Sequence, residues 1–562
     1  MYTVGSPPEL PVPNASVRSP SAWAGSLIFV HLFPLIFYLS TPLKMRFVDA
    51  KYKSKAFYHA IYARITLNRF TTLFFCFSLF YCFAQGILQS FLFSVDNEYD
   101  ALLNAITGQV IPPENITFLT GKPGSLRLEM CRDVPHVLVT GAVQDPYPCE
   151  TVFESQSIKS PTEGPTRSLL WADGVDVFKS APLSKLDGVT VTLRPAGQES
   201  SDISLSLQCV QNLHHAKERV AESRREELST VAVHFWLFAV SVIAIVNDSL
   251  PHLLTVIITR TLVTGWGSFA VWRSERDTKV FVELLEKPGT PCSLNLFSDY
   301  FSKRLTFQIA DLALAATALV VFIYLSLVLY RMYSSASFRC VGAPAHINRI
   351  NKFFLALLSC LQLEVFVVTA SMGLWIDVLL NTGLAKITPL MKIYITAFIM
   401  TMVSLLPWIA IGWFGAKRER RWYMLTFLIM SFIILFTWLL MFYSIIYRWT
   451  FLQWPFLACL TVMSLLLLIA NFVLGVICRT QFGKGHREYL LAEEALSALD
   501  FTREVFSRDE NREKFELPTP SRKNSTASNH SLDKDNEELS THQIRTLEKG
   551  ILDPKYGQFQ QV

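Results

Sequence analysis

The chain has 562 residues, of which 51% are apolar and 17% are charged, and its formal net charge is +5. Soluble domains usually carry about 25% charged residues. The composition therefore excludes an ordinary soluble protein, and the small net charge gives no indication of nucleic-acid binding.

Long apolar runs predict a membrane protein with about nine spans. A bilayer crossing takes about 20 predominantly apolar residues, and such segments recur along the chain. They are 23–42, 70–95, 229–247, 251–272, 305–330, 353–380, 389–415, 422–446 and 455–478. We interpret the first as a retained span rather than a signal peptide, because its basic flank is C-terminal and no small-residue cleavage site follows.

The region 229–272 is too long for one crossing and is interpreted as two helices. Asn247, Asp248 and Pro251 supply the break. With this break, all the basic loops lie on one side of the membrane. They are the loop after the first span and the segments 331–352, 417–421 and 479–487. The positive-inside rule assigns that side to the cytosol, so the N-terminus lies outside and the C-terminus lies in the cytosol.

This topology places residues 96–228 outside the cell. Alternating runs such as SLRLEM, HVLVTGAV, VTVTLRP and ISLSLQCV predict strands, and the charged run HHAKERVAESRREEL at 214–228 predicts a helical stalk. The fold class is therefore an all-α membrane bundle of about nine helices, with a small β-rich, disulfide-bonded extracellular domain inserted after the second span. The predicted parts are an extracellular N-terminus at 1–22, a two-span hairpin at 23–95, the extracellular domain at 96–228, a seven-helix bundle at 229–478, a juxtamembrane helix at 479–506 and a disordered cytosolic tail at 507–562.

Four of the ten cysteines, Cys131, Cys149, Cys209 and Cys292, fall on the predicted outside. Extracellular compartments are oxidising, so two disulfides are expected, and four cysteines allow three pairings. We favour Cys131 with Cys149, which leaves Cys209 to join the extracellular domain to the 273–304 loop.

Several short patterns predict modification. Asn115 and Asn14 are N-glycosylation acceptors on the predicted outside. In the tail, Ser525 and Thr519 lie in strings typical of kinase substrates, which would make cytosolic kinases or adaptors partners of the tail. The alternative is that any disordered tail contains such strings by chance.

No enzyme signature stands out. The chain contains no Walker loop, no HExxH, no paired CxxC metal framework and no nucleophile elbow, and its histidines are scattered. The sequence therefore predicts no cofactor and no metal site and names no catalytic residue, although a membrane enzyme assembled from distant residues stays open.

Charges inside the predicted spans are the remaining candidates. Arg260 and Glu364 lie near the middle of their spans, and Asp311 and Lys392 lie in the outer part of theirs. A mid-bilayer charge costs about 2.5–3.5 kcal/mol on insertion scales, so such residues usually face the bundle and pair. We expect Arg260 to pair with Glu364 and Asp311 to share a level with Lys392. These pairs either orient the helices or line a polar cavity for a ligand or ion.

Four stretches, SLPHLLTV, CVGAPAHINRINK, YRWTFLQWPF and LGVICRTQFGKG with a following YL, resemble an uncharacterised family of fungal multi-span membrane proteins over 228–490. Plasma-membrane proteins of smut and other fungi linked to growth in a host are similar. The resemblance implies a fungal surface protein linked to virulence and carries over no activity and no site residues. The topology from 229 onward also resembles receptors and cargo proteins in which a luminal domain precedes seven helices.

Two classes of function follow from these observations. In the first, the chain is a plasma-membrane receptor, sensor or trafficking scaffold that engages an unknown extracellular ligand or cargo. In the second, it is a transporter or channel with a polar path near Arg260 and Glu364. The extracellular domain and the long tail favour the first class. Internal repeats would favour the second, and we detect none in the sequence.

Overall fold

The computed structural model describes residues 61–108, 110–112, 115–135, 147–155, 167–168, 175–178, 189–193, 201–337, 345–387, 391–485 and 487–488. Within these residues, eight helices are long and apolar enough to cross a membrane. They are α3 (Arg69–Thr107), α5 (Leu207–Val246), α6 (Leu250–Phe281), α7 (Ser298–Ser337), α8 (Ala345–Asn381), α10 (Met391–Arg418), α11 (Arg421–Met441) and α13 (Pro455–Thr480). The predicted first span at 23–42, the acceptor Asn14 and the tail from 489 lie outside the described residues.

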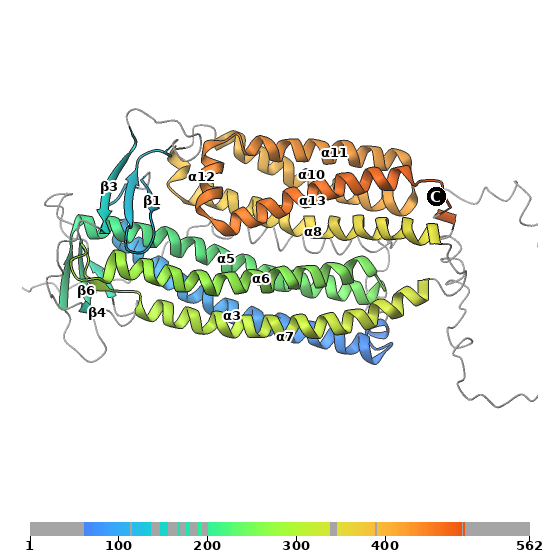
Figure 1. Cartoon of the computed structure of the whole chain (residues 1–562), viewed down its shortest axis with the longest axis horizontal. Coiled ribbons are helices and arrows are strands. Elements are labelled where there is room, and N and C mark those ends of the chain that lie inside the picture. Colours follow the sequence, from blue (N-terminus) through green and yellow to red (C-terminus); the bar gives the residue numbers. More distant parts are fainter. Residues whose placement is uncertain are drawn as a thin grey trace, which may run out of the picture. The chain divides into compact units, whose positions relative to one another are not determined.

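The helices form two groups of four, which lie one above the other in Figure 1. In the first group, α3 packs on α5 and α7, and α6 packs on the same two helices. In the second group, α8 packs on α10 and α13, and α11 packs on the same two helices. The two groups meet mainly where α6 lies against α8.

The turn between α5 and α6 confirms that the region 229–272 is two helices. Asn247 ends α5, Asp248 adopts a left-handed conformation with φ of 47°, and Ser249 is extended. Pro251 follows in the first turn of α6, where its missing N–H costs no hydrogen bond. An aspartate tolerates the left-handed region better than most residues, so the local sequence accounts for the reversal.

Short strands lie at one end of the bundle, which we call the strand end (Figure 1). The first sheet is antiparallel and contains β1 (Ile116–Thr120), β2 (Arg127–Cys131) and β3 (Cys149–Glu154). The second contains β5 (Val175–Phe178), β6 (Val189–Leu193) and β7 (Ser201–Leu205). A short parallel pair joins β4 (Arg167–Ser168) to β8 (Leu294–Asn295). The predicted strand HVLVTGAV lies outside the described residues, and ISLSLQCV is strand only as far as Leu205.

Three shorter elements complete the fold. The π-helix η4 (Val282–Glu286) extends α6, α9 (Leu384–Ile387) follows α8, and α12 (Ile445–Gln453) precedes α13. The segment of α12 was not expected as a separate helix. It begins at a Ser444 cap and ends at Trp454 before Pro455, which opens α13.

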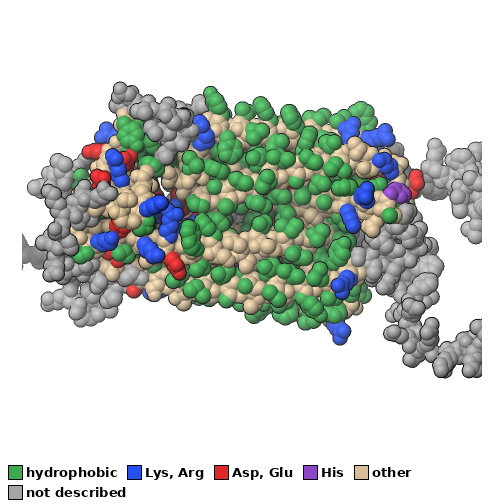
Figure 2. Space-filling view, viewed as in Figure 1, with side chains coloured by type: hydrophobic (Ala, Val, Ile, Leu, Met, Phe, Trp, Pro, Cys, Tyr) green, Lys and Arg blue, Asp and Glu red, His purple; other side chains and the backbone are tan. Residues whose placement is uncertain are grey.

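The side of the bundle between its two ends is largely apolar. Figure 2 shows hydrophobic side chains covering this face, with charged side chains gathered toward the two ends. Large apolar residues on different helices are more than half exposed, among them Phe80, Val320, Val403 and Phe432. An exposed apolar surface of this kind fits the hydrocarbon of a lipid bilayer.

Candidate functional site

The two charges expected to pair do not meet. The guanidinium of Arg260 lies 3.8 Å from the centre of the Phe322 ring and 6.0 Å from that of Tyr81, so it faces α7 and α3. Glu364 is fully buried on α8, where its Oε1 accepts a hydrogen bond of 2.8 Å from Ser464 on α13. The expectation was wrong because a shared depth fixes only the height of a residue and not the direction in which it faces around its helix axis.

The second pair of predicted charges is also not formed. Asp311 is buried on α7 and accepts a hydrogen bond of 2.8 Å from the side-chain amide of Gln89 on α3. Lys392 is exposed at the start of α10, in the other helix group. Of the four predicted intramembrane charges, three are therefore buried, and each of these contacts an uncharged neighbour.

Paired charges do occur, but nearer the strand end and on a segment that was expected to be a stalk. The helix α5 is continuous from Leu207 to Val246, so the charged run at 214–228 leads directly into the apolar half of the same helix. Its side chains pair with residues of α3, α6, α7 and α8. We call this set of ion pairs the charge layer. Its members are Asp96, Asp100, Arg219, Glu222, Arg224, Arg225, Glu226, Glu227, Arg273, Asp277, Arg304 and Asp377.

Arg304 on α7 holds the centre of the charge layer. One guanidinium nitrogen donates to Asp96 on α3, and another donates to Glu227 on α5 at 2.7 Å. The hydroxyl of Tyr300, one turn earlier on α7, donates to the same Asp96 oxygen at 2.9 Å. All four side chains are buried, and charge-assisted bonds of this kind are stronger than neutral ones. Arg304 therefore ties together three helices of the first group.

A second buried pair lies within the first group and accepts a hydrogen bond from the residue that precedes α13. The guanidinium of Arg273 on α6 binds both carboxylate oxygens of Glu226 on α5, at 2.9 and 2.5 Å. The indole N–H of Trp454, which precedes α13, donates to Glu226 at 2.7 Å. On the same side, Arg225 donates to Asp377 of α8 at 2.6 Å. Neighbouring residues of α5 thus contact the second group at two points.

The first sheet rests on the same helix. The hydroxyl of Thr117 on β1 donates to Glu218 and lies 3.0 Å from the ring of His215, and the backbone N–H of Thr117 also donates to Glu218, at 3.3 Å. Gln208 donates to the carbonyl of Val152 on β3 at 2.6 Å. Both strands are therefore fixed to α5 by hydrogen bonds.

The opposite side of β1 contacts the second helix group. The ring of Phe118 lies 5.2 Å from that of Trp449 on α12. Phe118 and Ile116 belong to an apolar cluster with Trp375 near the end of α8 and with Trp454. Because the strand β1 contacts α5 with one set of side chains and α8 and α12 with another, it bridges the two groups.

The two disulfides have the pairing that the sequence favoured. Cys131 and Cys149 join β2 to β3 at positions that are directly opposite in the sheet. Cys209, in the first turn of α5, joins Cys292, which follows η4. The second bridge therefore links the ends of α5 and α6 at the strand end.

Near the disulfide-bonded strands, Tyr147 donates a hydrogen bond of 2.8 Å to Glu129 of β2. Partial burial, together with the hydrogen bond to this carboxylate and its charge, raises the pKa of the Tyr147 phenol. Asn115, the predicted glycosylation acceptor, is half-buried before β1, and its side chain contacts Met130. Ser525 and Thr519 lie outside the described residues.

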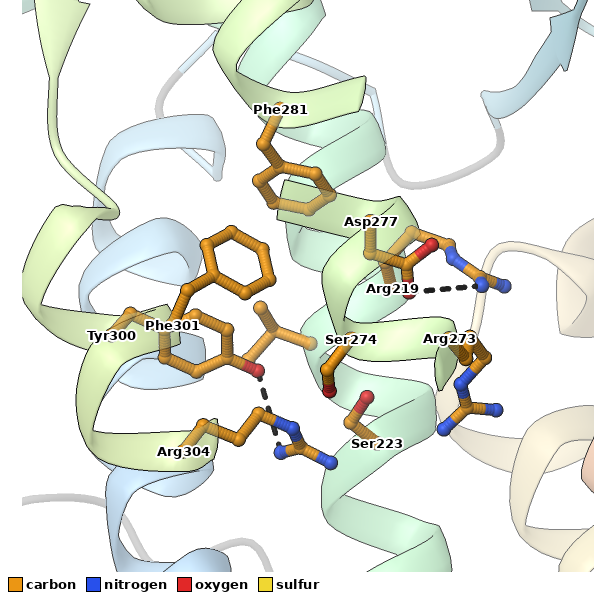
Figure 3. Close-up of a pocket in the computed structure, with 10 residues that line it drawn as sticks. Arg219, Ser223, Arg273, Ser274, Asp277, Phe281, Tyr300, Phe301 and Arg304 are labelled. Atoms are coloured by element: carbon orange, nitrogen blue, oxygen red, sulfur yellow. Dashed lines mark hydrogen bonds and ion pairs between the residues drawn. The ribbon is translucent and has the colours of Figure 1, made fainter. Parts of the chain in front are cut away.

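A small cavity lies beside the charge layer between α5, α6 and α7 (Figure 3). Arg219, Arg273 and Arg304 line it, with Ser223 and Tyr300 between them. Its volume is about 20 Å³, and a water molecule needs about 10–15 Å³ of such space. In this conformation, the cavity has room for about one water molecule and not for an organic substrate.

The charge layer was missed because the run at 214–228 was assigned to a stalk. Two signals in the sequence point to it. Arginines and glutamates follow one another on every face of that helix, and complementary charges occur at the ends of neighbouring apolar segments, at Asp96, Arg273 and Arg304. Charged residues at matched heights on several predicted helices are the pattern that indicates a layer of ion pairs.

Comparison with known proteins gives no relative. No family model, no curated protein and no solved structure matches the chain. Within the described residues, no group of three or more histidine, cysteine, aspartate or glutamate side chains is arranged to hold a metal ion. The chemistry of the charge layer is therefore that of ion pairs between helices, and its geometry connects the sheet, α5 and both helix groups.

Proposed function

We propose that the chain is a multi-span membrane receptor or sensor, in which the domain at the strand end engages an extracellular ligand and α5 conveys its state to the bundle. The bridging position of β1 carries this proposal. A displacement of β1 acts on α5 through Thr117 and on the second group through Phe118. Ligand binding at the strands would therefore change how the two helix groups sit against each other.

The proposed orientation has the strand end outside the cell. At the opposite end of the bundle, which we call the far end, Lys417, Arg418 and Arg349 are exposed, and Figure 2 has mostly basic side chains there. An excess of basic residues favours the cytosolic side, and disulfides form in oxidising compartments. We further propose a location in the plasma membrane, reached by the secretory pathway, and a fungal surface protein as the resemblance implies.

A receptor fits the charge layer better than a transporter does. Within the described residues, Arg219, Arg273 and Arg304, the arginines that line the cavity, are each bound by a carboxylate. Arginines saturated in this way hold helices together and leave little capacity for a charged substrate. The small volume of the cavity between them agrees with this interpretation.

A distance measurement across the far end tests the proposal. Spin labels introduced through non-natural amino acids at Asn247 and Lys417, both exposed, report the separation of the two groups by double electron–electron resonance in nanodiscs. The variant Phe118→Ala combined with Thr117→Val removes the side-chain contacts of these two residues with α12 and α5 and should shift or broaden the distance distribution. Thr120→Val is the matched control, because this strand residue bonds only to Arg127 of the same sheet.

Identical distributions in the wild type, the β1 variant and the control would rule out a relay from the sheet to the far end. The β1 variant is compared only after size-exclusion chromatography has shown a folded, monodisperse protein. Should it fail to fold, Cys131→Ser/Cys149→Ser perturbs the same sheet without any substitution in β1 and leaves the Cys209–Cys292 bridge in place.

A further inference from the structure

One face of α3 carries polar residues deep into the bundle. Ser78, Gln85, Gln89 and Asp96 are all at most 5% exposed. The stretch from residue 78 to residue 96 covers about 27 Å at 1.5 Å per residue, close to the thickness of a bilayer core. Within the described residues, each of these four side chains has an oxygen with no hydrogen-bond partner.

Asp311 on α7 lies opposite this face. Its Oδ2 accepts the hydrogen bond from Gln89, whereas its Oδ1 has no partner in the part of the chain that the structure describes. Gln89 Oε1 is likewise without a partner, and Gln85 presents another such oxygen one turn along the same face. Gln85 and Gln89, one turn apart on α3, and Asp311 on α7 thus each keep one acceptor oxygen without a donor among the described residues.

The charges that face Asp311 do not neutralise it. On its own helix, Arg304 lies two turns away and is held by Asp96 and Glu227. From α5, the buried Glu227 interacts electrostatically with Asp311 and has the same sign. The buried polar residues of α3 in this region, Gln85 and Gln89, are uncharged amides.

The two buried cations on α6 are also engaged elsewhere. Arg273 is bound by Glu226, and Arg260 stacks on Phe322, three turns further along α7. Among the described residues, Asp311 therefore forms no ion pair. An ionised carboxylate that is buried without a counter-charge is strongly unfavourable, whereas hard cations prefer carboxylate and carbonyl oxygens as ligands.

We propose that Asp311, with Gln89 and Gln85, forms a site inside the first helix group that takes up one small monovalent cation, either a proton or a sodium-sized ion. The bound cation neutralises the carboxylate and satisfies the acceptor oxygens around it. The receptor function proposed above does not require this site. Its presence would give the first helix group a state that depends on the cation concentration.

The test uses dicyclohexylcarbodiimide, an apolar reagent that modifies carboxyl groups when they carry a proton. The full-length protein in nanodiscs is treated at acidic and alkaline pH, in sodium chloride or in choline chloride, and adducts are mapped by mass spectrometry. At acidic pH in choline, Asp311 should be modified several-fold more than Asp96. Asp96 is the matched internal control, because it is equally buried in the same helix group but is paired with Arg304.

The two forms of the cation give different results. If the site takes a proton, the adduct at Asp311 decreases as the pH rises and is the same in sodium and in choline. If the site takes a sodium-sized ion, sodium lowers the adduct at a fixed pH, and Gln85→Leu weakens that protection. Ser90→Ala, on the exposed side of the same helix, should leave the protection unchanged.

A second measurement covers the case in which the reagent does not reach Asp311. The thermal midpoint of the wild type should rise with acid or with sodium, and Asp311→Asn should lose this response while remaining folded. The proposal is overturned if Asp311 is modified no more than Asp96 and both proteins respond equally to acid and to sodium.

Discussion

Arg304 occupies a position that lysine could not fill in the same way. Its planar guanidinium donates to Asp96 on α3 and to Glu227 on α5 at the same time. A lysine carries one compact ammonium group and does not reproduce this fork. At the scale of single residues, the charge layer therefore depends on the geometry of the arginine as well as on its charge.

Replacement of Arg304 should be among the most damaging single changes in the bundle. Arg304→Leu leaves two buried carboxylates without their partner, and breaking a buried pair costs about 3–5 kcal/mol. Arg304→Lys should be intermediate. Arg64→Leu is the control, since the side chains of Arg64 and its partner Asp248 are 52% and 41% exposed, and such exposed pairs contribute about 0–1 kcal/mol. Thermal unfolding followed by size-exclusion chromatography ranks the losses of stability, and equal losses for Arg304 and Arg64 would contradict this prediction.

Arg260 and Glu364 should behave as independent sites. They contact different helices and share no partner, and effects at such sites usually add to within about 0.5 kcal/mol. The double variant Arg260→Leu/Glu364→Leu should therefore lose the sum of the two single losses. Glu364→Gln should be tolerated, because the amide oxygen still accepts the bond from Ser464. Recovery of stability in the double variant would show that the two charges interact after all.

From the sequence, the burial of the charged residues in the spans was predicted correctly for three residues, whereas their partners were not. Arg260, Glu364 and Asp311 are buried as expected, because hydropathy around them gives their depth. Their partners depend on how each helix is rotated about its own axis and on which helix lies beside it. Hydropathy gives neither. Only tertiary packing determines the observed partners, which are Phe322 for Arg260, Ser464 for Glu364 and Gln89 for Asp311.

The helix α5 is the element on which the proposed relay depends. It starts one residue after a Ser206 cap, carries the contacts to β1 and β3 in its first three turns, and continues through the charge layer to Val246. A continuous helix transmits a displacement at one end to the other because its backbone hydrogen bonds keep it stiff. The predicted stalk at 214–228 and span at 229–247 described the composition correctly but did not show that both belong to one helix.

Breaking α5 just after its contacts with the sheet should weaken the coupling between the sheet and the rest of the bundle. Ala221→Pro removes a backbone hydrogen bond in the helix interior and costs about 3 kcal/mol or more. If α5 carries part of the relay, loss of the Cys131–Cys149 bridge by Cys131→Ser/Cys149→Ser should change the far-end distance distribution less in this variant than in the wild type, because only the contact of Phe118 with Trp449 remains. Ala221→Ser, which keeps the backbone N–H, should respond as the wild type does; an undiminished response in the proline variant would argue against α5 as the connection.

The bridge between Cys209 and Cys292 should contribute to the stability of the helix bundle, although it lies at the strand end. It closes a loop of 83 residues in sequence, and removal of a native disulfide typically costs about 2–5 kcal/mol. Cys209→Ser, Cys292→Ser and the double variant should lower the amount of mature protein equally, because each removes the same bond. A double variant clearly worse than either single variant would indicate that the thiols have separate roles.

On the scale of the whole molecule, the succession of long helices in the described residues follows from the lengths of the apolar segments and from the break at Asn247–Ser249. These features lie within each segment, so the sequence predicted them well. The packing of the helices into two groups of four depends on contacts between segments that are distant in sequence. The same is true of the position of the first sheet, which contacts both groups. The patterns of hydrophobicity carry no information on those contacts.

The orientation of the molecule is open to a direct test. A protease of broad specificity added to intact cells should cleave near the strands, for example in the exposed turn around Lys122 between β1 and β2, and should leave an epitope tag after Val562 intact. The same tag should become accessible when the membrane is permeabilised. Cleavage of the tag in intact cells would reverse the proposed orientation.

The link between Cys209 and Cys292 also constrains the order in which the protein is made. Cys209 leaves the ribosome before the rest of α5 and all of α6, and Cys292 follows only after both helices and their turn have been synthesised. The two thiols therefore meet only once α5 and α6 have formed a hairpin that brings its two open ends together. If the hairpin spans the membrane, a chain in which α6 failed to cross would leave Cys209 and Cys292 on opposite sides, and the bridge could not form.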